Sequence, residues 1–335
     1  MSSTSAYRIP IIYGAGTLGT PNDFGRDFSG KEAQAVVDGI SRNGPITIDT
    51  SNSYGGGTSE EVIATLDLHG GQVDTKIYPV SAGDHSAQKL KETFKGTLQR
   101  LKGAKVRVLY LHAPDRTVPF EETVSALNDL YKEGHFEEFG LSNYLSYEVA
   151  EIVSICKAKG YVVPTVYQGV YNAVDRTIET ELIPCLRRYG LKFAAYCPLA
   201  GGFLVGLHLD ENSAAEENSH FDKNTLFGWY FNERYMGMVG PVRELRDIAG
   251  KHDLTIHQAS SRWLQHHSAL IPSDLGIIYG ASKLHHIEPL LQYNSEGPLP
   301  EEVVQAFEEC YQKVKGALPN YNHSPAWYDP KIHGY

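Results

Sequence analysis

Residues 106–142, VRVLYLHAPDRTVPFEETVSALNDLYKEGHFEEFGLS, contain the pattern that decides the fold. An apolar, β-branched run (Val106–His112) is followed by a helix-length amphipathic segment (Phe120–Glu133) and then by a second strand-like run (Glu138–Ser142). A strand, a helix and a further strand in this order are typical of a βαβ unit, in which the two strands are parallel.

The same alternation extends through most of the chain. The strands that we predict are Ile11–Tyr13, Ile46–Asp49, Gln72–Ile77, Val106–His112, Glu138–Ser142, Thr165–Tyr171, Lys192–Pro198 and Gly276–Ala281. The predicted helices are Lys31–Arg42, Ser59–Leu68, Ser86–Lys102, Phe120–Glu133, Tyr147–Lys159, Glu179–Tyr189, Val242–Lys251, Ile256–His266, His286–Tyr293 and Glu301–Val314. Ser59, with two glutamates after it, is a plausible N-cap. Eight units without a break in composition favour a closed (β/α)8 TIM barrel, a single domain over 1–335 with a C-terminal tail at 315–335.

One motif offers an alternative, an open doubly wound sheet. Gly14-Ala15-Gly16-Thr17-Leu18-Gly19 matches the G-x-G-x-x-G pattern of dinucleotide-binding turns. That pattern indicates dinucleotide binding only where it follows a strand and leads directly into a helix. Here it leads into Pro21, Asn22 and Asp23, and the next predicted helix begins only near Lys31. We therefore interpret it as a loop at the end of the first strand.

Composition excludes several classes of protein. Of the 335 residues, 41% are hydrophobic and 21% charged, as in an ordinary globular protein. The net charge of −10 argues against a nucleic-acid surface, which needs lysine and arginine to neutralise phosphates. Met1–Pro10 does not resemble a secretory signal, and no apolar run reaches membrane-spanning length. The four scattered cysteines indicate free thiols, so we expect a soluble, cytoplasmic protein.

Ionisable residues stand at or just beyond the ends of three successive predicted strands. Asp49 and Tyr54 follow the second strand, Lys76 lies at the end of the third, and His112 ends the fourth. In a parallel barrel these ends meet at one mouth, where barrel enzymes place catalysis. Reduction of a carbonyl needs a hydride at carbon and a proton at oxygen. We predict that Tyr54 gives the proton, its pKa lowered by Lys76, which Asp49 holds charged. A neutral His112 would polarise the carbonyl.

Several short motifs occur in order along nearly the whole chain. They are Asp49-Thr50-Ser51-Asn52-Ser53-Tyr54-Gly55, Thr75-Lys76, Leu111-His112-Ala113-Pro114-Asp115, Gly140-Leu141-Ser142-Asn143-Tyr144, Tyr167-Gln168, Tyr171-Asn172, Tyr196-Cys197-Pro198-Leu199-Ala200-Gly201-Gly202 and Gly280-Ala281-Ser282. Together they resemble the aldo-keto reductase superfamily. Gly297-Pro298-Leu299-Pro300 and Pro319-Asn320-Tyr321 resemble its aflatoxin-aldehyde reductase branch in particular.

The resemblance implies an NADPH-dependent reductase with Asp49, Tyr54, Lys76 and His112 as its catalytic tetrad. It implies cofactor contacts from a further set of residues: Ser142, Asn143 and Gln168 at the carboxamide, Tyr196 on the nicotinamide ring, Leu199, Gly201 and Leu204 at the pyrophosphate, and Ser282 at the ribose phosphate. Arg234 matches an arginine that, in this branch, faces carboxylate-bearing aldehydes. The branch resemblance is also consistent with a homodimer.

The adenine side departs from the family pattern. Where the branch usually has polar residues, this chain has His286, Pro289 and Leu290, and Leu207 stands where a lysine is expected. Lys283 is an additional cation beside the ribose-phosphate position, and Lys283 and His286 suit a phosphate. We therefore predict that the cofactor is NADPH rather than NADH.

Gly201–Asn232 is the longest stretch without clear periodicity, and we predict an active-site loop over 201–240. Long irregular connections in compact domains are usually functional. Its aromatic residues, Trp229 among them, suit either a lid over a bulky or aromatic substrate or simple helix packing. Two histidine pairs, His266-His267 and His285-His286, lack the spacing of metal ligands, so we expect no metal site. The rival function is a cofactor-binding regulatory module with little turnover, like channel-associated members of the superfamily.

Overall fold

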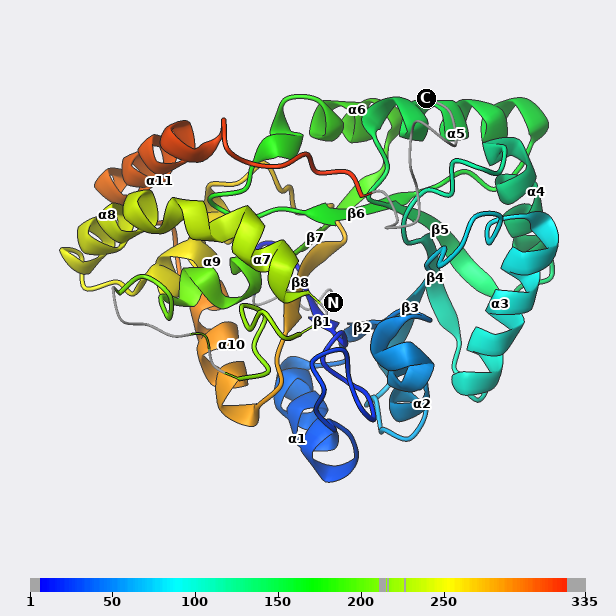
Figure 1. The fold of residues 1–335 in the computed structure, drawn as a ribbon, viewed down its shortest axis with the longest axis horizontal. Helices are drawn as coiled ribbons and strands as arrows, with labels where there is room; N and C mark the ends of the chain where they lie inside the picture. The colour runs from blue at the N-terminus through cyan, green and yellow to red at the C-terminus, as the bar shows by residue number, and fades with distance from the viewer. Residues whose placement is uncertain (1–6, 211–214, 216, 226, 324–335) are drawn as a thin grey trace, which may run out of the picture.

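The structure is a computed structural model that describes residues 7–210, 215, 217–225 and 227–323. Its centre is a closed barrel of parallel strands in sequence order, with β1 beside β8 (Figure 1). The strands are β1 (Ile11–Gly14), β2 (Thr47–Asp49), β3 (Gln72–Ile77), β4 (Val106–Leu111), β5 (Phe136–Ser142), β6 (Val166–Val170), β7 (Lys192–Tyr196) and β8 (Gly276–Gly280). The predicted TIM barrel is confirmed, and each predicted strand lies within a few residues of an observed one.

Helices surround the barrel on its outside (Figure 1). They are α1 (Gly30–Ile40), α2 (Thr58–Ile63), α3 (Ala87–Arg100), α4 (Phe120–Lys132), α5 (Ser146–Lys159), α6 (Leu182–Tyr189), α7 (Gly228–Tyr235), α8 (Val239–Gly250), α9 (Ile256–His266), α10 (Ile287–Ser295) and α11 (Glu301–Val314). Short 3-10 turns include η1 (Ser41–Asn43), η2 (Tyr54–Gly57), η4 (Ala200–Val205) and η6 (Leu284–His286). Among the described residues, no helix has both the length and the apolar character that crossing a bilayer demands.

Two local predictions need correction. Ser59 is not an N-cap: α2 begins one residue earlier, and the Ser59 hydroxyl is buried, 2.9 Å from Thr50 Oγ1 and 3.1 Å from the Ala15 carbonyl oxygen. Its hydrogen-bonding capacity is used in tertiary contacts. In addition, α7 begins inside Gly201–Asn232, the stretch in which the sequence showed no clear periodicity.

The glycine motif after β1 forms a loop, as predicted. Fifteen residues separate the end of β1 at Gly14 from the start of α1 at Gly30, so no helix opens directly from the motif. The open-sheet alternative is therefore wrong. Within the loop, Gly19 and Phe28 form an antiparallel bridge that closes it on itself.

The loop after β1 packs against the long connection between β7 and α8. Arg26 Nη2 donates to the Asn218 carbonyl oxygen at 3.2 Å, and the Phe24 ring lies 4.5 Å from that of His220. Phe227 is also close to Phe24, with ring centroids 6.3 Å apart. The described part of the predicted loop 201–240 is thus anchored to the first loop of the barrel. Residues 211–214, 216 and 226 of that range, and 324–335 of the predicted tail, lie outside the described residues.

The barrel interior contains polar and aromatic groups that need close packing. Arg107 Nε donates to Asp74 Oδ1 at 2.9 Å, and burial raises the pKa of Asp74 to about 6 although the arginine opposes the shift. Beside this pair on β4, the Tyr110 ring is completely buried and lies against Gly140 of β5. A Cβ at position 140 would stand 2.3 Å from the Tyr110 ring. Only glycine leaves room for this tyrosine.

We expect Gly140→Ala to lower the free energy of unfolding by about 1–3 kcal/mol, because the added methyl group displaces Tyr110 in a packed interior. Urea unfolding followed by circular dichroism measures the change. Gly250→Ala is the matched control, since a Cβ there meets no atom within 4 Å. Equal stability of Gly140→Ala and the wild type would contradict the steric argument.

Candidate active site

A buried ion pair joins the carboxyl ends of β2 and β3. Lys76 Nζ donates to Asp49 Oδ2 at 2.6 Å and to the Thr50 carbonyl oxygen at 2.8 Å. Both charged side chains are buried, with 0% of Lys76 and 4% of Asp49 exposed. The other carboxylate oxygen of Asp49 accepts from Gln168 Nε2 at 2.8 Å, a contact that crosses the barrel from β6. The ammonium is therefore held in one place by fixed oxygen atoms.

Tyr54 reaches this ammonium from a tight turn. Lys76 Nζ lies 3.3 Å from the Tyr54 hydroxyl oxygen and 4.8 Å from the ring centroid. The turn η2 includes Gly55 and Gly56 with φ of 56° and 62°, values that glycine adopts without strain. Asp23 Oδ1 accepts from the Gly55 amide at 2.8 Å and fixes the turn. Sequence reasoning missed Asp23, which has no motif to mark it.

The balance of effects on the Tyr54 phenol differs from the prediction. Burial raises the pKa of Tyr54 above its ordinary value, and the charge of Lys76 only partly opposes that rise. Burial also lowers the pKa of Lys76, but Asp49 and Tyr54 raise it by more, so the amine stays charged. The phenol is therefore protonated at neutral pH. The ammonium lies where its charge would stabilise a phenolate.

His112 follows β4 beside the phenol. Its ring lies edge-on to that of Tyr54, with centroids 5.6 Å apart, and its Nδ1 is 3.0 Å from Ser51 Oγ. Burial, and then the charge of Lys76, holds the pKa of His112 well below its usual range. The ring is neutral at pH 7 and can donate one hydrogen bond. The structure thus brings together the four predicted residues, and adds Ser51 as a partner that sequence reasoning missed.

The residues predicted for the carboxamide lie in a connected network at the ends of β5, β6 and β7. Asn143 Nδ2 donates to the His112 carbonyl oxygen at 2.8 Å and to Ser142 Oγ at 3.0 Å. Its Oδ1 accepts from the Tyr196 hydroxyl at 2.8 Å. Gln168 is directed at Asp49, as described above. All these groups are hydroxyls or amides, which can donate to and accept from a carboxamide.

The residues predicted for the pyrophosphate, Leu199, Gly201 and Leu204, lie at or beside η4. Gly201 and Gly202 have φ of 66° and 100°. A Cβ on Gly202 would meet nothing within 4 Å, whereas one on Gly201 would stand 2.4 Å from the Phe231 ring. The backbone at Gly202 is therefore open to the approach of another molecule. Leu207, the residue in place of the expected lysine, is 57% exposed.

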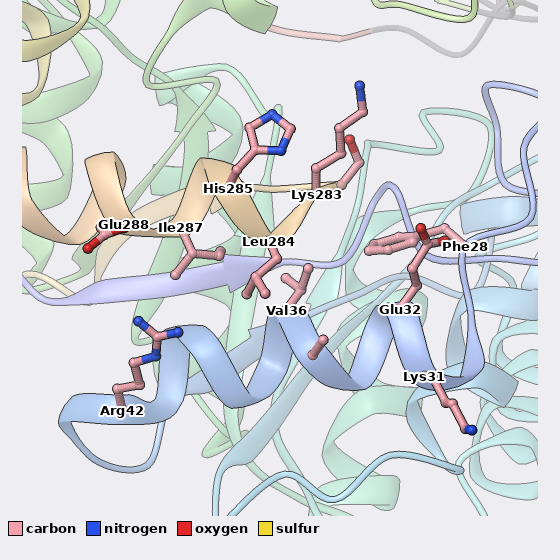
Figure 2. Close-up of a pocket in the computed structure, with 12 residues that line it drawn as sticks. Phe28, Lys31, Glu32, Val36, Arg42, Lys283, Leu284, His285, Ile287 and Glu288 are labelled. Atoms are coloured by element: carbon pink, nitrogen blue, oxygen red, sulfur yellow. The ribbon is translucent and has the colours of Figure 1, made fainter.

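Ser282 and Lys283 line a hollow of about 770 Å³ between α1 and η6. Figure 2 shows Lys283 and His285 directed away from α1, while Leu284 points toward it. His285 lines the hollow and the predicted His286 does not. Leu290 is one of the residues that depart from the family pattern on the adenine side. It is buried, so its side chain takes part in the packing of α10. The hollow lies on the outside of the barrel, apart from the tetrad.

The two residues predicted for the substrate lie on α7 in different environments. Arg234 is 4% exposed, and its Nε donates to Asp175 Oδ2 at 2.5 Å. Its Nη1 is 3.4 Å from the Asn320 carbonyl oxygen, and its Nη2 is buried without a hydrogen-bond partner among the described residues. Trp229 is 62% exposed, with its ring centroid 6.0 Å from that of Tyr230. Asp175, a partner that the sequence did not reveal, neutralises part of the charge of Arg234.

Comparison with known proteins shows the family of this chain. The model of the aldo/keto reductase family matches residues 10–312. The chain belongs to the aldo/keto reductase family. It is 39% identical to an aldo-keto reductase of Pseudocercospora fijiensis over 84% of this chain and 97% of the relative. It is 37% identical to aflatoxin B1 aldehyde reductase member 2 of Homo sapiens over 92% of this chain and 89% of the relative. The resemblance to that branch is confirmed.

A solved structure also has this fold. The crystal structure of the thermostable aldo-keto reductase Tm1743 superposes with a TM-score of 0.63 at 22% identity, over 90% of this chain and 95% of the other. Membership of the aldo/keto reductase family makes the chain an oxidoreductase and implies NAD(P)H-dependent reduction of carbonyl compounds.

We expect Lys76→Met in this aldo-keto reductase to lower the free energy of unfolding by about 3–5 kcal/mol, because the Asp49 carboxylate is left buried and unpaired. The double variant Lys76→Met/Asp49→Asn removes that charge and should recover part of the loss. Chemical unfolding at pH 7 measures all three proteins. A double variant no more stable than Lys76→Met would show that the unpaired charge is not the cause.

Proposed function

We propose that this aldo-keto reductase reduces a bulky or aromatic aldehyde or ketone to the alcohol with NADPH, and that Tyr54 supplies the proton. The observation that carries the proposal is the position of Lys76 Nζ, 2.6 Å from Asp49 and 3.3 Å from the Tyr54 hydroxyl, in a site that also holds a neutral His112. Carbonyl reduction requires three groups from the protein: a proton donor, a cation that stabilises the conjugate base of that donor, and a neutral hydrogen-bond donor for the carbonyl oxygen.

His112 orients the substrate carbonyl in this proposal. When the Ser51 hydroxyl donates to Nδ1, the ring carries its single proton on Nε2 and can donate it in a hydrogen bond to the carbonyl oxygen. Because the ring is buried and neutral, it holds the carbonyl without losing the proton that it shares. The proton that the oxygen finally keeps comes from Tyr54.

Lys76 stabilises the anion that Tyr54 leaves behind. The ammonium is already in place and already paired with Asp49 before the reaction, so little reorganisation accompanies proton transfer. Because burial holds the pKa of Tyr54 above its ordinary value, the phenol keeps its proton until the substrate oxygen becomes basic. The residues thus store the proton at neutral pH and release it only to a developing alkoxide.

The residues present fit a nicotinamide cofactor. Ser142, Asn143 and Gln168 offer hydroxyl and amide groups beside the tetrad, and the backbone at Gly202 is open. A reduced nicotinamide, when bound, supplies the hydride. We place its ring against Tyr196 and its carboxamide on the Ser142–Asn143 network, where it would exchange some of the existing hydrogen bonds.

We assign NADPH, rather than NADH, on the basis of the charge near Ser282. Lys283 and His285 point the same way from the start of η6, away from α1 (Figure 2). A cation beside a serine hydroxyl suits the phosphate that distinguishes the two cofactors. We retain His286 as a proposed cofactor-binding residue because it is next to His285 in the chain, although it does not line the hollow.

The aromatic residues around α7 support a bulky or flat substrate. Trp229 is exposed on the first turn of the helix, and Tyr230 and Phe231 follow with rings in contact. Arg234 contributes a buried Nη2 without a partner among the described residues, which we propose as the donor to a carboxylate of the substrate. The panel of test substrates should therefore pair one aromatic aldehyde with its carboxylate-bearing analogue.

A second candidate is a cofactor-binding regulatory module with little turnover. It is favoured by one observation, the apolar replacements Pro289 and Leu290 on the adenine side. Nucleotide binding detected by tryptophan fluorescence, without consumption of NADPH on any aldehyde, would support the module. We further propose a cytoplasmic location and a homodimer. Light scattering on the purified protein, which measures its molar mass, checks the homodimer.

Tyr54→Phe should lower kcat for aldehyde reduction by about 100-fold or more, because the general acid is lost. In the wild type we expect kcat to be constant from about pH 7 to pH 9.5 and to fall above pH 10, because the proton donor is lost as pH rises through a pKa raised above 10.0. NADPH oxidation followed at 340 nm measures both. Equal kcat for the two proteins would remove Tyr54 from its role.

Lys283→Ala should raise the dissociation constant for NADPH by about fivefold or less, as expected for a solvent-exposed ion pair, and leave that for NADH unchanged. Titration of intrinsic fluorescence with each nucleotide measures the two constants. Lys251→Ala, an exposed lysine at the end of α8, is the control. A parallel loss of affinity for both nucleotides would contradict the assignment of Lys283 to the ribose phosphate.

A further inference from the structure

The end of the described chain lies across the carboxyl end of the barrel. We name residues 318–323 the C-terminal strap. From α11 it runs past α6 toward β5 and β6 (Figure 1). The Asn320 carbonyl oxygen lies 3.4 Å from Arg234 Nη1, and the Tyr321 hydroxyl accepts from the Ser146 amide at 3.0 Å. The His323 amide donates to the Asn143 carbonyl oxygen at 3.0 Å. These polar contacts attach the strap to α7 and to the segment that joins β5 to α5.

The strap brings His323 to Tyr78, 245 residues away in the chain. The Tyr78 hydroxyl oxygen and His323 Nε2 are 2.6 Å apart. Burial lowers the pKa of His323 and raises the pKa of Tyr78 to about 12, so both groups are neutral at pH 7. The hydroxyl donates to Nε2 in the tautomer that carries its proton on Nδ1. Asn52 Oδ1 accepts from the Tyr78 amide at 3.0 Å and fixes the backbone of the tyrosine.

Tyr78 in turn packs against His112. The two rings are 5.4 Å apart at an interplanar angle of 85°, while Tyr54 meets the same imidazole at 5.6 Å and 79°. The hydrogen bond from Ser51 fixes the distance of Nδ1, but one hydrogen bond does not fix the tilt of a ring about it. The two aromatic edges supply that second constraint. The hydrogen bond to His323 is the side-chain contact that ties the Tyr78 hydroxyl to the strap.

We propose that Tyr78 and His323 are positioning residues for His112, so that docking of the C-terminal strap sets the direction in which the imidazole donates to the substrate. The inference rests on the proposed function, in which His112 orients the carbonyl. The strap is anchored to the core by Tyr321, which is buried, and by Leu318, which packs against the same cluster. Its other residues are less buried: Pro319 and Asn320 are exposed, and Asn322 and His323 are half-buried. Beyond Tyr321, the hydrogen bonds of His323 hold the end of the strap at the site.

A double-mutant cycle tests the proposal. Tyr78→Phe keeps the ring and removes the hydroxyl, His323→Ala removes the acceptor, and the double variant removes both. Each single variant should lower kcat by about tenfold, the upper range for the loss of one neutral hydrogen bond, with the dissociation constant for NADPH within twofold of wild type. The double variant should be no slower than either single one, because all three lose the same hydrogen bond.

Two further variants separate positioning from general support of the strap. His323→Gln keeps a hydrogen-bond acceptor for Tyr78 and should recover most of kcat. Asn322→Ala, the preceding residue on the strap, should leave kcat unchanged. Losses that multiply in the double variant, or wild-type kcat in His323→Ala, would overturn the proposal. Should His323→Ala fail to fold, failure of His323→Gln to preserve kcat decides against it.

A readout without turnover keeps this inference separate from the proposed function. In the cofactor-free protein, the imidazole ¹⁵N and ¹H resonances of His112, assigned by their absence from His112→Gln, should shift in Tyr78→Phe and His323→Ala alike. Unchanged resonances in both variants would refute the positioning contact. If the wild type reduces no carbonyl while these shifts occur, the proposed function fails and the contact stands.

Discussion

The buried pair of Lys76 and Asp49 is the interaction on which the rest of the site depends. An ammonium with no exposed surface is tolerated only where oxygen atoms replace its water, and here Asp49 and the Thr50 carbonyl do so. The pair in turn places a positive charge beside Tyr54 and next to His112. Together with burial, which is the larger effect, this charge holds the pKa of His112 well below its usual range. The ammonium also offers the Tyr54 phenol a counter-charge, although burial still raises the pKa of the phenol.

The barrel makes that arrangement possible by fixing strand ends. Asp49 belongs to β2, Lys76 to β3 and Gln168 to β6, and the carboxylate of Asp49 receives hydrogen bonds from both other strands. A carboxylate held from two sides of a closed sheet cannot follow the motion of one loop. The glycine at position 140 has a related role, because it makes room for a buried tyrosine between the strands.

The loops around this rigid centre are joined by a different kind of contact. Arg234 with Asp175, Phe24 with His220, and the C-terminal strap with Asn143 each link segments far apart in the sequence. These contacts lie at the end of the barrel where the proposed function places the carbonyl compound and the nicotinamide. The site is consequently built in two layers, an interior of ionic pairs and an outer set of aromatic and polar contacts that shapes access.

The sequence by itself determined the eight strands, most of the helices and the identity of the central residues, because period and spacing are local properties and because motifs such as Asp49–Gly55 mark the strand ends. It did not reveal Asp23, Ser51, Asp175 or the contact of Tyr78 with His323, since nothing in a single sequence pairs residues up to 245 positions apart. Nor did it give the net pKa of Tyr54. The sequence predicts that Lys76 lies near Tyr54. Only the tertiary structure decides how deeply the phenol is buried, and the effect of burial on its pKa outweighs that of the cation.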